Sequence, residues 1–177
     1  MRPLLIAIIL AASMESCAAA GGDEPGLAET ANGFYGVYRT FHPSDGVPFD
    51  SDRAKYAPFL SPALEKLLRD AQAAETRFAT TNKGAPPLIE GDLFTSMFEG
   101  ASTVEVGACS ADGAAGQCAV KLEYSEPKNK PIEWTDTVYL VNTTSGWRVD
   151  DIGYGASWAF ANKGRLSETL KQVLSFQ

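Results

Sequence analysis

The chain has 177 residues, a hydrophobic share of 45% and a formal net charge of −7. This length and composition suit one globular domain. The acidic balance argues against nucleic-acid binding, which needs clustered Lys and Arg, and against electrostatic attachment to anionic lipid.

The first twenty residues have the pattern of a secretory signal peptide. Arg2 is positively charged, Leu4 to Ala12 form an uncharged apolar run, and Ala18-Ala19-Ala20 places small residues ahead of Gly21. The apolar run is too short to span a bilayer, and no later stretch is apolar enough to do so. We therefore expect residues 1–20 to be cleaved off, and the remaining chain to work in the periplasm or as a secreted protein, without membrane insertion.

Cys17 leaves an alternative open, because a cysteine directly after an apolar run can be a site of lipid attachment. Ser16 suits such a site, whereas Met14 and Glu15 do not. The sequence favours ordinary cleavage, and the alternative is a domain anchored to an envelope membrane through a lipid on Cys17. Residues 21–26 are predicted to form a flexible tether, and residues 27–177 a single domain.

Cys109 and Cys118 are the two cysteines that remain, and export favours a disulfide between them. The eight residues between them are turn-rich and do not match the short spacing of a redox pair. Two cysteines and the single histidine are too few for a structural zinc site, and the sequence predicts neither a metal nor a cofactor.

Two helices are predicted in the first half of the domain. Gly33 and Gly36 lie within the first helix and indicate close packing against another element, or a helix held by tertiary contacts, because glycine weakens a helix interior. His42-Pro43 ends this helix. Its apolar residues recur at helical spacing: Leu27, Ala31, Phe34, Tyr35, Tyr38 and Phe41. Ser61-Pro62 begins the second helix, which runs to about Thr80.

Residues 44–60 are predicted to form a loop, and Asp92 to Phe98 a short helical turn. Asp50-Ser51-Asp52 supplies two carboxylates to the predicted loop. Calcium prefers oxygen ligands, but two carboxylates without a glycine at the required turn make a weak calcium site.

The hydrophobic period changes to two in the second half of the chain, which predicts strands at residues 104–106, 120–124, 135–141 and 147–152. Residues 142–146 are predicted to form a hairpin loop, and residues 166–174 a short C-terminal helix. Helices followed by a meander of strands indicate an α+β domain with its helices on one face of an antiparallel sheet.

The register of the first two strands contains a conflict. Pairing Val106 with Leu122 places two apolar side chains on one face, but it puts Cys109 and Cys118 on opposite faces. A β-bulge near Gly107 would reconcile the two pairings. Alternatively, the disulfide lies in an irregular turn.

Four segments carry a resemblance to known proteins: Phe34–Tyr38, Leu60–Leu64, Pro87–Phe94 and Trp147–Ile152. In order and spacing they resemble the cone-shaped nuclear-transport-factor-2-like fold, and among its families the exported bacterial domain-of-unknown-function family 3828. The resemblance covers residues 27–174. It implies N-terminal helices packed on a bent four-stranded antiparallel sheet, a pocket between them and an envelope location. It implies no activity.

The pocket interpretation rests on aromatic side chains, which suit a small amphipathic ligand. The predicted ligand-binding residues are Tyr35, Tyr38, Phe98, Trp147 and Trp158. The alternative is that these residues fill the core, together with Trp134, Tyr139 and Tyr154. The first interpretation makes the chain a non-enzymatic binding module.

An enzymatic alternative follows from fold analogy alone. Some enzymes of the cone fold use a buried Asp as a base and a Tyr as an oxyanion donor, so Tyr38 with Asp92 or Asp150 would suit a small lyase or isomerase. Because Asp150 and Asp151 are adjacent, one of them is expected to point inward. That carboxylate would alternatively cap a backbone or pair with an arginine, either Arg148 or Arg165.

His42 is the single histidine of the chain, and nothing around it indicates a catalytic triad or a metal set. A partner-binding interpretation uses the outer face of the sheet and the loop Glu126–Pro131, where two prolines stiffen the chain. It allows a protein partner or a homodimer. The alternative is that this loop is a solvated connector.

Overall fold

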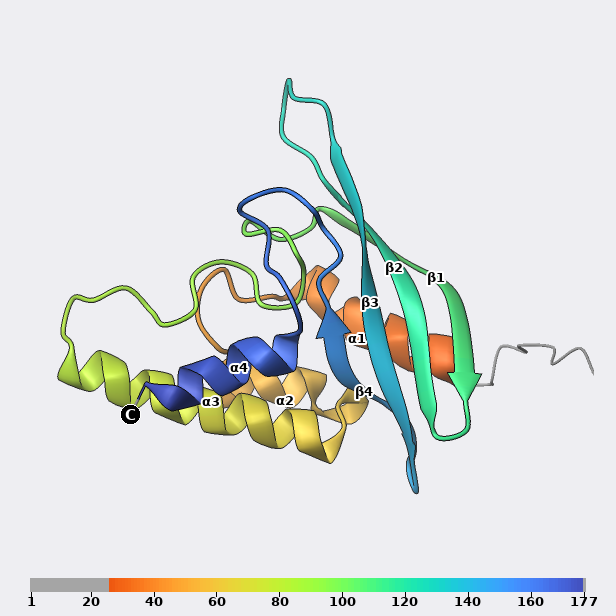
Figure 1. Cartoon of the computed structure of the whole chain (residues 1–177), viewed down its shortest axis with the longest axis horizontal. Coiled ribbons are helices and arrows are strands. Elements are labelled where there is room, and N and C mark those ends of the chain that lie inside the picture. The colour runs from red at the N-terminus through yellow and green to blue at the C-terminus, as the bar shows by residue number, and fades with distance from the viewer. Residues whose placement is uncertain (1–25, 177) are drawn as a thin grey trace, which may run out of the picture.

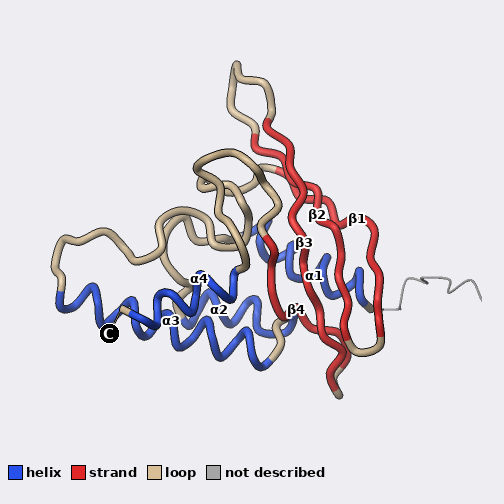
Figure 2. Tube along the Cα trace, in the orientation of Figure 1, coloured by secondary structure: helices blue, strands red, loops and turns tan. Residues whose placement is uncertain are grey.

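The structure is a computed structural model that describes residues 26–176, so the predicted signal peptide and Cys17 lie outside the described residues. Residues 26–176 form four α-helices, one short 3₁₀-helix and a four-stranded antiparallel sheet. Figures 1 and 2 show the helices grouped against the sheet, and the connection between β2 and β3 projecting beyond it. The predicted α+β class is confirmed.

Helix α1 spans Leu27–Thr40, close to the predicted bounds, and Phe41 follows it. Its buried face matches the rest of the predicted stripe: Leu27, Ala31, Phe34, Tyr35 and Tyr38. A Cβ atom on Gly33 would lie 2.1 Å from the ring of Phe59, whereas one on Gly36 would meet nothing within 4 Å. Of these two glycines, Gly33 is therefore closely packed and Gly36 is not.

This difference yields a matched pair of substitutions. Gly33→Ala should destabilise the protein by about 1–3 kcal/mol, because the Phe59 ring must move. Gly36→Ala should stabilise it by up to about 1 kcal/mol, because alanine is the better helix former and the space is open. Urea unfolding of both variants is the measurement, and equal effects would contradict the packing described for Gly33.

Helix α3 spans Pro62–Thr81, as its start signal predicts. The Ser61 hydroxyl accepts a hydrogen bond from the backbone N–H of Leu64 at 3.0 Å, and Pro62 occupies the first turn. The buried side chains Leu64 and Leu68 lie one turn apart and face the core.

Residues 50–59 correct the prediction of a loop over residues 44–60. They form helix α2, Asp50–Tyr56, and the 3₁₀-helix η1, Ala57–Phe59. Asp50 and Asp52 lie in the first turn, where they favour a helix through its dipole. They also pair with Arg53 and Lys55, at 2.8 and 2.9 Å. The segment is too short for a clear apolar period, which is why the sequence did not reveal it.

The predicted helical turn at Asp92 to Phe98 is also wrong, because the segment consists of bends and a turn. Several of its backbone polar groups bond to distant partners instead of to the next helical turn. The Ser96 N–H donates to Asp136 on β3, and the Leu93 carbonyl accepts from the Tyr154 hydroxyl at 2.7 Å.

The sheet has the strand order β1-β2-β3-β4, with strands Thr103–Asp112, Ala115–Tyr124, Ile132–Thr143 and Gly146–Gly153. Burial alternates along β2 and β3, so one face is covered and the other is exposed. The β3–β4 turn lies within the predicted hairpin loop.

The register of β1 and β2 differs from the predicted one. Val106 lies opposite Val120 instead of Leu122, so that prediction is wrong by two residues. The register shifts between Val106 and Cys109, which confirms the bulge expected near Gly107. As a result Cys109 lies opposite Cys118, and the two form a disulfide between neighbouring strands.

Helix α4, Leu166–Ser175, packs beside α3 and closes the domain. Asp151 points inward and accepts hydrogen bonds from the Ser167 backbone N–H at 2.9 Å and the Ser167 hydroxyl at 2.8 Å. The Arg165 guanidinium lies 3.6 Å from the same carboxylate. The sequence predicts that an inward Asp is either a catalytic base or a cap or arginine partner, and Asp151 has the second, structural role. Among the described residues, no helix is both long and apolar enough to cross a membrane.

Candidate functional site

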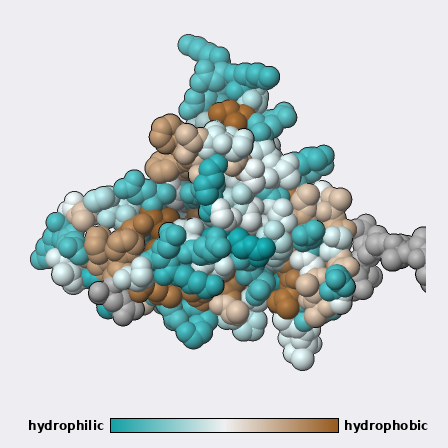
Figure 3. All heavy atoms as spheres, in the orientation of Figure 1, coloured by the Kyte–Doolittle hydropathy of each residue, from teal (hydrophilic) through white to brown (hydrophobic). Residues whose placement is uncertain are grey.

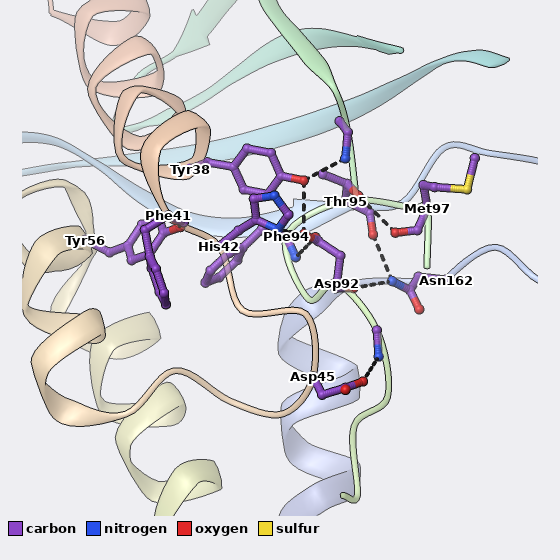
Figure 4. Close-up of polar contacts among 12 residues, drawn as sticks. Tyr38, Phe41, His42, Asp45, Tyr56, Asp92, Phe94, Thr95, Met97 and Asn162 are labelled. Carbon is purple, nitrogen blue, oxygen red and sulfur yellow. Dashed lines mark hydrogen bonds and ion pairs between the residues drawn. The ribbon is translucent and has the colours of Figure 1, made fainter. Parts of the chain in front are cut away.

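Tyr38, Asp92 and His42 meet where the C-terminal end of α1 approaches the segment before β1 (Figure 4). The Tyr38 hydroxyl donates to Asp92 Oδ2 at 3.0 Å and accepts from the Ala101 N–H at 2.8 Å. The His42 ring stacks on the Tyr38 ring, with centroids 4.4 Å apart. Its Nδ1 lies 2.9 Å from Asp92 Oδ2, without the alignment of a directed hydrogen bond. The structure thus brings together the predicted pair of Tyr38 and Asp92.

The backbone around Asp92 is built to hold its carboxylate in place. Oδ1 accepts from the Phe94 N–H at 2.7 Å, a local side-chain turn. The Asn162 side-chain amide donates to the carbonyls of Asp92 and Thr95. Gly100 has φ 83°, and a Cβ there would lie 2.9 Å from both Tyr38 Oη and His42 Cε1. Only glycine fits at this position.

Burial separates the roles of the three side chains. Asp92 and Tyr38 are buried, whereas the His42 side chain is 31% exposed and is the part of the cluster that reaches solvent. Burial, and then the charge of Asp92, raises the pKa of Tyr38, which keeps its phenol a neutral donor. The contact with Asp92 raises the pKa of His42 against the opposing effect of burial.

The raised pKa of His42 predicts a pH dependence of stability. The stabilisation from its interaction with Asp92 is fully present below the unfolded pKa of about 6.5 and is lost as pH rises through the folded pKa. The free energy of unfolding should therefore fall as pH rises above about 6.5. Because the chain has one histidine, NMR can follow its titration directly. Asp92→Asn should lower the His42 pKa, and a pKa at or below 6.5 in the unaltered protein would contradict the contact.

His42 was not selected as a site residue from the sequence. Helix α1 ends at Thr40 and Phe41 is extended, so helical spacing does not place His42 on Tyr38. The stacking of the two rings depends on the path of the chain beyond the helix, which the sequence pattern does not reveal.

Tyr35 lies beside Tyr38 and is fully buried, and its hydroxyl has no hydrogen-bond partner among the described residues. Burial, and then the charge of Asp136, raises the pKa of Tyr35. The two tyrosines lie in the same helix but differ in what their hydroxyls contact, so the same substitution distinguishes them.

Tyr35→Phe should leave the free energy of unfolding unchanged or slightly higher, because it removes a buried hydroxyl without a partner. Tyr38→Phe should lower it by about 1–3 kcal/mol, because Asp92 and the Ala101 N–H each lose a partner. Chemical denaturation of the two variants is the measurement. A larger loss for Tyr35→Phe would contradict this arrangement.

Asp136 on β3 is a second buried carboxylate, and sequence reasoning missed it. Its oxygens accept from the Ser96 N–H at 2.8 Å, the Trp134 indole N–H at 3.1 Å and the Gly155 N–H at 2.8 Å, and also from the Ser96 hydroxyl. Burial raises its pKa although these hydrogen bonds act in the opposite direction. The alternation of β3 was the available signal, since it places residue 136 on the same face as Trp134 and Val138.

The predicted ligand-binding aromatic residues lie in different surroundings. Tyr35, Tyr38 and Trp147 are buried in the core, so they present almost no surface to a ligand in this structure. Trp158 is partly buried and packs edge-to-face on Trp134, with centroids 5.6 Å apart. Phe98 is 47% exposed.

Asp150 is not brought to Tyr38. It accepts a hydrogen bond from the Ser61 hydroxyl at 2.5 Å, at the start of α3. Asp50 and Asp52, considered as calcium ligands, pair with Arg53 and Lys55. Across residues 26–176, no three His, Cys, Asp or Glu side chains are grouped to hold a metal ion.

The loop Glu126–Pro131 lies at the tip of the β2–β3 hairpin (Figure 1). The Tyr124 hydroxyl and the Asn129 side-chain amide both donate to the carboxylate of Glu126, so the loop is held by its own hydrogen bonds. The exposed side chains of the sheet beside it are mainly polar or charged, including Glu105, Lys121 and Glu133.

A cavity of about 520 Å³ lies between the C-terminal half of α3 and two loops, residues 45–49 and 85–87; we call it the α3 groove. The Glu75 side chain links α3 to the two segments beside the groove. Its Oε2 accepts a hydrogen bond from the Val47 N–H at 2.7 Å, and its Oε1 accepts one from the Ile89 N–H at 3.4 Å. Figure 3 shows apolar atoms between hydrophilic ones over the end of the molecule where α3, α4 and the loop after α3 lie. The lining residues are Asp45, Gly46, Val47, Phe49, Gln72, Glu75, Thr76, Phe78, Ala79, Thr80, Ala85, Pro86 and Pro87.

The fold and these sites define a small α+β domain with a buried carboxylate network and an apolar surface groove. Comparison with models of known protein families finds no match, and comparison with curated protein sequences finds none either.

Proposed function

We propose that the chain is an extracytoplasmic domain of the nuclear-transport-factor-2-like type, related to domain-of-unknown-function family 3828, that binds a small amphipathic ligand. The α3 groove is the observation that carries this proposal. Its volume of about 520 Å³ lies in the range of small-molecule sites, and apolar walls with a few polar groups are typical of them.

The burial of the core supports a binding role over catalysis by Asp92 and Tyr38. Both side chains are almost fully enclosed, and their polar atoms already have partners. A carboxylate held in this way stabilises the segment that it anchors and does not reach a substrate from its present position. The disulfide is compatible with the extracytoplasmic location that the N-terminal sequence predicts.

Native mass spectrometry of the protein purified from its own cell envelope tests this proposal. A bound ligand appears as an added mass that is lost on denaturation, and its formula gives the chemical class. The denatured mass also distinguishes cleavage after residue 20 from lipid attachment at Cys17. A protein partner or a homodimer would appear as a complex of higher mass. A monomer without added mass in every preparation would contradict a tightly held ligand.

An acid–base enzyme, of the lyase or isomerase class, is the second candidate, and the meeting of Tyr38, Asp92 and His42 favours it. In this form His42 would exchange the proton, because its ring is partly exposed, and Asp92 would position it. If a turnover is found, His42→Gln should abolish it, and Asp92→Asn should shift its pH profile to lower pH. Activity unchanged in both variants would contradict this role.

A further inference from the structure

We propose that the α3 groove selects amphiphiles that carry a cationic group, such as an alkyl or aryl ammonium, over neutral and anionic ones. This inference rests on the proposed function, since it requires that the groove is a binding site. It adds the charge of the ligand, which the binding proposal leaves open.

The walls of the groove supply the apolar part of the site. Phe49 on one loop is 66% exposed, and Phe78 on α3 lies in the lining with Pro86 and Pro87 of the other loop. An exposed phenylalanine beside further apolar side chains is a surface on which an alkyl or aryl group would lose contact with water. The faces of aromatic rings also attract cations.

The charged groups of the groove have one sign. Asp45 and Glu75 line it, and the lining contains no Lys, Arg or His. Among the ion pairs of residues 26–176, none includes either carboxylate. Asp45 accepts from the Gly91 N–H at 2.9 Å and Glu75 from two backbone N–H groups, so both carboxylates are held in place by neutral donors and their charges face no basic side chain in the groove. The groove therefore complements a positive charge.

Two other depressions of the described surface lack this character. The one between α3 and α4 mixes Lys66 and Lys171 with Asp70, Asp150 and Asp151, and Lys66 pairs with Asp70. A depression on the sheet combines glutamates with Lys121, and its one aromatic lining residue, Trp134, is buried. Carboxylates without a basic neighbour, next to exposed aromatic side chains, distinguish the α3 groove from both.

The test compares octyltrimethylammonium, octanol and octanoate, which share an alkyl chain and differ in charge. Calorimetric titration of the exported chain, at low salt and below micelle formation, should give the tightest binding for the ammonium. We expect it to bind about fivefold more tightly than octanol, with octanoate the weakest. The preference should shrink as salt is added, because the carboxylates are partly exposed.

Three variants assign the binding to the groove. Phe49→Ala should weaken the binding of all three probes. Asp45→Asn should reduce the preference for the ammonium and leave octanol binding unchanged. The side-chain carbonyl oxygen that remains in Asp45→Asn can still accept the Gly91 hydrogen bond, so the loop should stay folded. Phe160→Ala is the matched control, because this phenylalanine is 90% exposed and does not line the groove.

The ways in which the proposal could fail are distinguishable. Equal binding of the three probes, still weakened by Phe49→Ala, would overturn the charge preference and leave the binding function standing. If the affinity for the ammonium is unchanged in both Phe49→Ala and Asp45→Asn, the assignment to the groove is overturned. No binding of any probe would overturn this inference, while a ligand retained in native mass spectrometry would still support a binding domain with another site.

Discussion

Asp136→Ala should lower the free energy of unfolding by about 4 kcal/mol. The substitution removes the acceptors of four hydrogen bonds, donated by Ser96, Trp134 and Gly155, at a fully buried position. A buried donor without a partner costs about 1–3 kcal/mol, and some of that cost is recovered when the structure relaxes or water enters. Urea unfolding followed by circular dichroism is the measurement.

Asp136→Asn is the matched control, because it keeps the shape of the side chain and one carbonyl oxygen. It should cost about half as much, since the new amide cannot accept from the donors that faced the replaced oxygen. A loss below about 1 kcal/mol for Asp136→Ala would contradict the role of Asp136 as the anchor of the segments around Ser96 and Gly155.

Loss of the disulfide should have the second large effect. The double variant Cys109→Ala, Cys118→Ala should be less stable by about 2–3 kcal/mol, the value that the chain-entropy model gives for a loop of this length. Alanine is chosen because Cys118 is fully buried and a serine hydroxyl there would add a separate cost. Thermal or urea unfolding of the variant against the oxidised protein is the measurement.

Thiol labelling provides the control for that experiment. A protein of residues 21–177, denatured without reductant, should show no free thiol if Cys109 and Cys118 are joined. Two labelled cysteines would contradict the disulfide. A variant as stable as the oxidised protein would instead show that the neighbouring β-turn already restricts the unfolded chain.

Local patterns were sufficient to predict the elements whose formation depends on nearby residues. The stripe of α1 and the Ser61-Pro62 start of α3 both act within a few residues, and both are confirmed. Helix α2 was missed because its seven residues bury only Arg53 and Tyr56, too few for a visible period. Its stability depends on tertiary contacts, such as the hydrogen bond from the Tyr56 hydroxyl to the Phe41 carbonyl.

The error in strand register has a simple physical reason. A slip of two residues keeps every side chain on the same face, so the apolar pattern cannot distinguish Val120 from Leu122 as the partner of Val106. The bulge was predictable because it changes the face, and the two cysteines require that change.

The two candidate sites also differ in whether the sequence could predict them. The Tyr38–Asp92 pair came from analogy with the cone fold, and it exists because Asp92 is turned inward by its bond to the Phe94 N–H. The α3 groove could not be predicted, because its two loops are distant in the sequence. They are joined by the Glu75 carboxylate, by the bridge between Asp45 and Glu90, and by the hydrogen bond from the Gly91 N–H to Asp45.

The most direct test of the binding account is an NMR titration of isotopically labelled protein, residues 21–177, with octyltrimethylammonium. The account predicts that the largest backbone shifts occur at the α3 groove, at Phe49, Gln72 and Phe78. The buried core residues Tyr35 and Trp147 should change little. Largest shifts in the core, with the groove unchanged, would contradict the account and place the ligand site in the interior of the domain.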